Sequence, residues 1–161
     1  MSTLVFMKAR IIKSPEMEKY KPHPGTKAAP GVHEKLLGTI GAYKVWIVDG
    51  TIVRDNLYID FVQGGNPGRY RFIPENELWL EKEFRAEDTY ATMIHEYVEC
   101  FYMRQMGMSY SMAHDEAADI EKKFRDAVSE KKAIASLKGA IEFLKTNFGR
   151  EKNAVRNQAS E

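Results

Sequence analysis

Cysteine is nearly absent from the 161-residue sequence, because Cys100 is the only one. An intrachain disulfide is therefore excluded, and with it the cross-linked framework of many small secreted proteins. The apolar stretch from Leu4 to Met7 is too short for a signal peptide, and nowhere do about 18 apolar residues run together as a membrane-spanning helix requires. These absences predict a cytoplasmic protein that does not enter a membrane.

The sequence also lacks an excess of charge of either sign. It has 24 lysines and arginines against 23 acidic residues, so its formal charge of +1 gives no overall attraction for nucleic acid or anionic lipid. Arg69, Arg71 and the lysines near the C-terminal end form no concentrated basic patch, and we interpret them as solvated surface. We therefore predict no nucleic-acid partner.

Proline is scarce, and four of the six prolines fall between Ser14 and Gly31. Because proline removes backbone donors and blocks regular helix, residues 14–31 are predicted to form an irregular arm. Two β-rich runs surround Asp49-Gly50 in the segment 43–54, and Asp-Gly suits a two-residue turn. This segment is predicted to be a β-hairpin.

Further strands are predicted in the middle of the chain. Residues 57–63 and 69–74 alternate apolar with polar side chains and are joined by the turn-forming sequence GGNPG of residues 64–68, which predicts a second hairpin. The run ELWLE, residues 77–81, is typical of a short strand, and its acidic ends favour a position at the edge of a sheet.

From about Glu87 the apolar residues recur every three or four positions, which predicts an amphipathic helix ending near Gly107. Ser109 is placed to cap a second helix, and a third is predicted from the spacing of four apolar residues. Those four residues are Ile134, Leu137, Ile141 and Leu144. Strands followed by helices indicate an α+β fold, with helices on one face of a small antiparallel sheet, in a single domain of residues 1–148. Residues 149–161 are predicted to be a flexible polar tail.

Histidine is scarce as well, and two of the four histidines, His95 and His114, fall on the predicted helices. A helix turns 100° per residue, so His95 and Glu99 point the same way from successive turns. The short turn before Ser109 forces the first two helices to pack together, which can bring His114 to that pair. Two imidazoles and one carboxylate are a sufficient ligand set for a catalytic zinc ion, and they also suit Fe(II).

Several nearby side chains are candidates for supporting roles. Glu96 is the candidate catalytic base, because it follows His95 and could take a proton from a metal-activated water. Glu121 could orient His114, but a surface ion pair with Arg125 is the slightly preferred explanation. Two tyrosines, Tyr102 and Tyr110, could donate hydrogen bonds to a developing oxyanion, but aromatic residues at helical spacing are more often core. The whole set could instead be a buried polar network tying two helices together.

The sequence Ile94-His95-Glu96-Tyr97-Val98-Glu99 resembles the zincin metallopeptidases, whose mark is a helix carrying His-Glu-x-x-His. Here Glu99 stands at the second ligand position, and His114 stands where the glutamate-ligand branch places its carboxylate. Residues 43–125 also look like a group of phage-type proteins, in which case the compartment would be the host cytoplasm. The resemblance implies a zincin-like fold and a zinc-dependent, peptidase-like hydrolase acting on a peptide or protein. The alternative is a non-catalytic accessory or interaction protein with a structural metal or a polar network.

Overall fold

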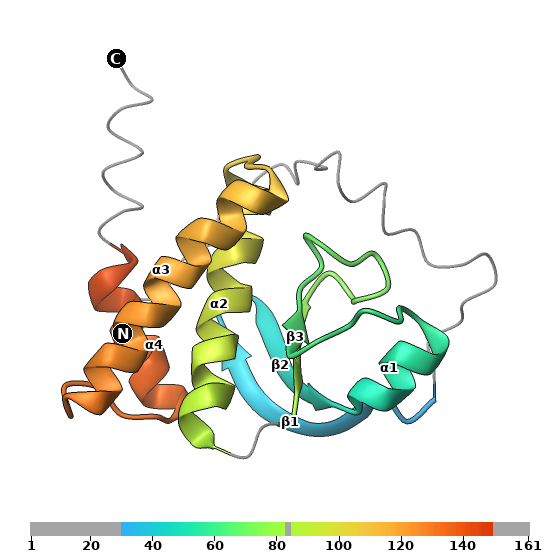
Figure 1. Ribbon diagram of the computed structural model, residues 1–161, viewed down its shortest axis with the longest axis horizontal. Coiled ribbons are helices and arrows are strands. Elements are labelled where there is room, and N and C mark those ends of the chain that lie inside the picture. Colours follow the sequence, from blue (N-terminus) through green and yellow to red (C-terminus); the bar gives the residue numbers. More distant parts are fainter. Residues whose placement is uncertain (1–29, 83–84, 150–161) are drawn as a thin grey trace.

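The computed structural model describes residues 30–82 and 85–149, and Figure 1 shows their arrangement. The proline-rich arm predicted at residues 14–31 lies outside the described residues except for its last two, and so does the predicted tail beyond residue 149. The elements in chain order are β1 (His33–Ile40), β2 (Tyr43–Val48), α1 (Gly50–Asn56), β3 (Gly64–Gly65), β4 (Glu77–Glu81), α2 (Ala86–Gln105), α3 (Tyr110–Ser129) and α4 (Leu137–Asn147).

The α+β class predicted from the sequence is confirmed, but the sheet is mixed rather than wholly antiparallel. Its strand order is β1-β2-β4-β3. Strands β1 and β2 form an antiparallel pair, whereas β2 and β4 run parallel with Trp46 opposite Trp79. A parallel neighbour requires a crossover connection. Here that connection comprises α1, β3 and the loops on either side of β3.

The hairpin predicted around Asp49-Gly50 is wrong, because α1 begins there. Oδ1 of Asp49 accepts hydrogen bonds from the backbone nitrogens of Thr51 (2.8 Å) and Ile52 (3.1 Å), so Asp49 is the N-cap of a helix. Gly50 lies close to the Arg54–Glu81 ion pair, since a Cβ there would lie 2.1 Å from Oε1 of Glu81 and that side chain would have to move. The same Asp-Gly pair that suits a hairpin turn thus starts a helix pressed against the sheet.

The second predicted hairpin is also wrong, because the segment between α1 and β4 contains only the two-residue strand β3. Its aromatic residues are buried in a second apolar cluster instead of facing each other across a ladder. Phe61 and Tyr70 pack there against Trp79 of the sheet and Val53 of α1. Tertiary burial of these rings therefore overrides the alternating pattern.

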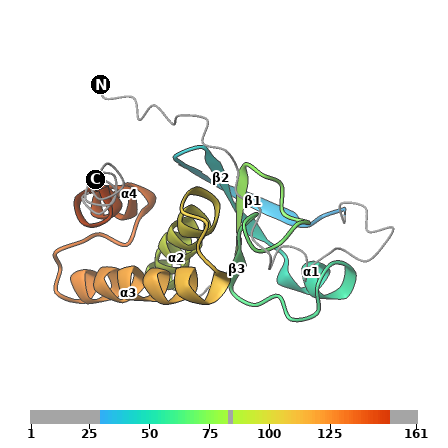
Figure 2. The same cartoon turned by 90° about the horizontal axis from the view of Figure 1, so that it is seen from above.

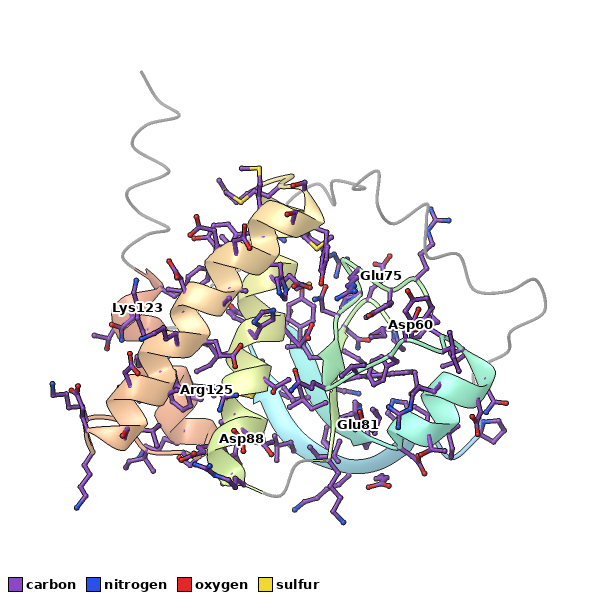
Figure 3. The ribbon with its side chains drawn as sticks, viewed as in Figure 1. Asp60, Glu75, Glu81, Asp88, Lys123 and Arg125 are labelled. Carbon is purple, nitrogen blue, oxygen red and sulfur yellow. The ribbon has the colours of Figure 1, made fainter. Side chains whose placement is uncertain are left out.

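The strand predicted at residues 77–81 is confirmed as β4, but it lies inside the sheet between β2 and β3 rather than at an edge. Leu78 and Leu80 face the main core, and Trp79 faces the second cluster. The acidic ends are accommodated by partners: Glu81 pairs with Arg54 of α1 at 2.8 Å, and Glu77 accepts a hydrogen bond from Trp79 at 2.7 Å. Figure 3 shows Glu81 between the sheet and α1.

The helices follow the sequence prediction closely. The first two expected helices are α2 and α3, and α3 begins at the predicted cap, where the Ser109 hydroxyl accepts from the Met112 nitrogen at 3.3 Å. The third predicted helix is α4, but Ile134 precedes it and is 72% exposed. In Figures 1 and 2, α2 lies between the sheet and α3. No helix in the described part of the chain combines the length and apolar composition needed to cross a bilayer.

Candidate metal centre

The centre of the molecule contains polar side chains where α2 crosses the sheet. Because α2 has neighbours on both sides, His95, Glu96 and Glu99 are all buried, and Glu99 is only 1% exposed. His95 and Glu99 lie one turn apart, and Nε2 of His95 is 3.3 Å from Oε2 of Glu99. The predicted convergence of these two side chains is therefore present.

Helix α3 supplies the third candidate ligand. The chain reverses at Gly107, which adopts a positive φ of 65°, and α3 then runs back along α2. Nδ1 of His114 lies 3.0 Å from Oε2 of Glu99 and 3.0 Å from Nε2 of His95. The His114 side chain is 45% exposed, against 2% for that of Glu99, so this group of residues is open to solvent at His114.

Hydrogen bonds alone do not satisfy the three contacts among these atoms. Burial alone would raise the pKa of Glu99, but its contacts with His95, His114 and Asn66 lower the pKa below 4.5, so Glu99 is a carboxylate at neutral pH. If both ring nitrogens donate to it, two N–H groups face each other at 3.0 Å. If one nitrogen is unprotonated, it can accept from the other, but its lone pair then faces the carboxylate; if both are unprotonated, the two lone pairs also face each other. A cation among the three atoms would satisfy all of them at once.

The spacing of the three atoms also suits a metal ion. Zinc bonds to nitrogen and carboxylate oxygen are about 2.0–2.2 Å long, so tetrahedral ligands lie roughly 3.4 Å apart. The three separations here are 3.0, 3.0 and 3.3 Å, slightly shorter than that value. His95, Glu99 and His114 therefore form a group that could hold a metal ion.

Glu121 lies at this site, but it contacts a different histidine from the one predicted. Its Oε2 is 2.9 Å from Nδ1 of His95, not next to His114. The antiparallel packing of α2 and α3 explains the correction, because residues further along α3 lie beside earlier residues of α2, so the Glu121 side chain meets His95. Its other oxygen, Oε1, accepts from Nε of Arg125 at 2.9 Å, so the alternative ion pair is present too. Burial by itself would raise the pKa of Glu121, but its contacts with His95 and Arg125 outweigh burial and lower the pKa.

Asn66 is a residue of the site that sequence reasoning missed. It is fully buried, and its Nδ2 donates to Oε2 of Glu96 at 2.8 Å and to Oε1 of Glu99 at 2.9 Å. Its Oδ1 accepts from the backbone nitrogens of Gly68 (2.9 Å) and Arg69 (3.2 Å). The GGNPG sequence predicted only a turn, and nothing in the chain near Asn66 indicates that its side chain reaches α2.

Glu96, the predicted base, is buried next to this amide. Burial, with a further contribution from the nearby Glu99 carboxylate, raises the pKa of Glu96 from 4.5 to about 8, while His95 and Asn66 act in the opposite direction. Strand β3 packs closely over the side chain, because a Cβ at Gly64 would lie 3.1 Å from Oε1 of Glu96. A raised pKa of this kind suits a group that takes up and releases a proton near neutral pH.

The two tyrosines proposed as hydrogen-bond donors occupy different surroundings. Tyr102 is buried and packs edge-on against Phe148 with ring centroids 5.7 Å apart, which is a core position. Tyr110 lies beside the site, with its ring 5.4 Å from that of His114 and the Arg69 guanidinium 4.1 Å from its ring centre. Its hydroxyl also accepts a hydrogen bond from Arg69. The structure thus brings Tyr110 to the candidate ligands.

Comparisons with protein-family models, curated proteins and solved structures found no match for this chain. The zincin resemblance of residues 94–99 therefore stays a prediction from the sequence. The functional argument depends on the geometry of the site itself.

Proposed function

We propose that the protein is a zinc-dependent hydrolase of the peptidase type, cleaving a peptide or amide bond. His95, Glu99 and His114 would hold the metal, and Glu96 would act as the base. The observation that carries the proposal is the triangle of three ligand atoms, 3.0 to 3.3 Å apart, around one point. An ionised carboxylate and two imidazoles that converge in this way are a ligand set that a bound cation would satisfy.

Zinc fits the donor set better than the other common ions. Two imidazole nitrogens and one carboxylate oxygen match catalytic zinc sites, in which one position stays open, and Ca²⁺ or Mg²⁺ would prefer an all-oxygen set. Fe(II) accepts the same donors, so metal content has to be measured on protein purified without air. The Glu121 contact with His95 supports the proposal, because a histidine that binds a metal usually bonds a carboxylate through its other nitrogen.

Zinc held by these three residues would lower the pKa of a coordinated water from 15.7 to about 7. The protein's own contribution to hydrolysis is then the handling of the proton. Glu96, with a pKa of about 8, would take the proton of the attacking water and deliver it to the leaving nitrogen. Asn66 supports this role by holding Glu96 and Glu99 through one amide group. The solvent-exposed side of His114 gives a substrate access to the site.

The test compares Glu96→Gln with the unchanged protein. We expect one equivalent of zinc in both, and a loss of at least 100-fold in hydrolysis of a mixed peptide library by the variant, since general-base catalysis contributes roughly 10²–10⁴-fold. Glu116→Gln, at an exposed position on α3, is the matched control and should keep full activity. Equal activity in Glu96→Gln would reject Glu96 as the base.

A second candidate is a non-catalytic protein in which the same residues hold a structural metal or only each other. The observation favouring it is that His95 and Glu99 are both buried and already bonded within the α2–α3 interface. The same experiment separates the two functions. Zinc binding with no hydrolysis by the unchanged protein across the library favours the structural metal, and no uptake of zinc or iron favours the polar network.

A further inference from the structure

A row of charged side chains leads from His95 to the first turn of α2. Oε2 of Glu121 faces Nδ1 of His95 at 2.9 Å, while Oε1 is 2.9 Å from both Nε and Nη2 of Arg125. The third guanidinium nitrogen of Arg125, Nη1, donates to Oδ1 of Asp88 at 2.5 Å. Figure 3 shows Arg125 on α3 and Asp88 on α2, next to each other.

The two oxygens of the Glu121 carboxylate have different partners in this row. A carboxylate bonded only to an imidazole can rotate about its side-chain torsions, and the ring can follow it. Here the planar guanidinium of Arg125 places two nitrogens on one oxygen, which leaves the other oxygen directed at His95. Asp88 in turn fixes the guanidinium from the opposite helix. Every side chain in the row is partly shielded from water, so its charges are screened less than those of exposed pairs.

We propose that Arg125 is a positioning residue for the metal centre, acting through Glu121 to hold the His95 ring in its ligating orientation, with Asp88 as its anchor. This inference rests on the metal site of the proposed function. It implies that metal affinity depends on an ion pair outside the ligand set. It also implies that the helices carrying the ligands are tied together at Asp88 and Arg125, where α3 lies alongside the start of α2.

The experiment measures the zinc dissociation constant of the full chain by competition with a chromophoric chelator. Arg125→Gln should bind zinc roughly tenfold more weakly, since loss of outer partners of metal ligands costs about 10–100-fold in affinity. Arg125→Lys keeps the positive charge but cannot place two nitrogens on one carboxylate oxygen. Its zinc affinity should fall between those of the unchanged protein and Arg125→Gln. Lys122→Gln is the matched control: it removes the same charge from the same helix and breaks an exposed pair with Asp126, at 2.7 Å. Its affinity should stay within twofold of the unchanged protein.

A double variant tests whether Arg125 acts through Glu121. Glu121→Gln and Arg125→Gln combined should bind zinc no more weakly than Glu121→Gln alone, whereas independent effects would multiply. A purely structural role would lower the melting temperature in chelator and leave the dissociation constant unchanged. Zinc binding by Arg125→Gln within twofold of the unchanged protein, or multiplying effects in the double variant, would overturn the inference alone. Absence of zinc binding by the unchanged protein would overturn the proposed function with it.

Discussion

Oε2 of Glu99 lies 3.0 Å from Nδ1 of His114, although the two residues belong to different helices and are separated by 15 positions in the chain. The contact crosses the interface between α2 and α3, so the candidate metal centre and the packing of these helices depend on each other. Changes to the ligands should therefore alter stability as well as metal content. The predictions below follow from this coupling and from the surroundings of each side chain.

Removing the metal should destabilise the protein. A ligand present at 1,000 times its dissociation constant stabilises the folded state by about 4.1 kcal/mol, which for a chain of this size corresponds to roughly 8–16 °C in melting temperature. We expect a strong chelator to lower the melting temperature by about that amount, and His114→Ala to lose both the metal and the response to chelator. His33→Ala, which alters a histidine far along the chain on β1, should keep its metal. A chelator response that persists in His114→Ala would exclude His114 as a ligand.

Stability should depend on pH differently with and without metal. The pKa of Glu96 is raised by burial from 4.5 to about 8; for His95, burial lowers the pKa, but hydrogen bonds with Glu121 and Glu99 outweigh it and raise it from 6.5 to about 10. A folded-state pKa above the unfolded value gives stability that is present at low pH and lost as the pH rises. The chelated protein should therefore lose stability between pH 5 and pH 9.

Metal binding reverses part of this trend, because a ligating imidazole must give up its proton. The difference in melting temperature between zinc-loaded and chelated protein should thus widen as the pH rises from 6 to 9. Differential scanning fluorimetry across that range checks both statements. A difference that is constant with pH would mean that no proton is displaced from His95 on binding.

Asn66 should be among the least tolerant positions of the chain. Asn66→Asp replaces the shared donor with a third carboxylate beside Glu96 and Glu99, and Asn66→Ala leaves two backbone nitrogens without their side-chain acceptor. Each buried polar group left unpaired costs about 1–3 kcal/mol. Urea unfolding should show a loss of at least 2 kcal/mol for either variant, and under 1 kcal/mol for the exposed control Asn56→Ala. A loss below 1 kcal/mol in Asn66→Asp would contradict the bridging role.

Asp49→Ala tests whether a helix or a hairpin follows Asp49. Loss of an N-cap side chain costs about 0.5–2 kcal/mol, and asparagine caps about as well as aspartate. We therefore expect Asp49→Ala to be destabilised by about 1 kcal/mol and Asp49→Asn to be near neutral in urea unfolding. A hairpin turn would also accept asparagine, so the additional variant Thr51→Pro separates the two. In the first turn of a helix, proline removes only the Thr51 donor to Asp49 and should cost about as much as Asp49→Ala, whereas in a hairpin strand it would break the ladder and cost more.

Helices α2, α3 and α4 could be predicted from the sequence because their signals are local, whereas α1 could not. The three-and-four spacing along α2 and the Ser109 cap of α3 act within a few residues, and so does the one-turn separation of His95 and Glu99. Two helices joined by a short turn have few ways to pack, which is why His114 was also predicted at the site. The nearest neighbours of the carboxylates could not be predicted in the same way, because Asn66 reaches them across 30 and 33 positions of the chain.

The errors in the sheet have a related cause. Asp-Gly suits both a hairpin turn and the start of a helix, and the helix is stabilised by tertiary burial, because Val53 of α1 packs in the second apolar cluster. Strand β1 carries mostly exposed side chains and showed no clear alternation, so it was not predicted. Glu121 lies at the predicted site but contacts His95 rather than His114, because α3 runs antiparallel to α2.

The parallel pairing of β2 with β4 has a consequence for how such a centre can be built. An antiparallel neighbour is reached by a turn of two residues, which leaves no spare chain, whereas a parallel one obliges the backbone to travel the length of the sheet again. In this protein the segment that connects β2 to β4 packs against α2 and places the Asn66 side chain there. Its amide lies between the carboxyl groups of Glu96 and Glu99, which would otherwise repel each other. The connectivity of the sheet therefore supplies the Asn66 amide, which allows α2 to bury two carboxyl side chains in the interior of the protein.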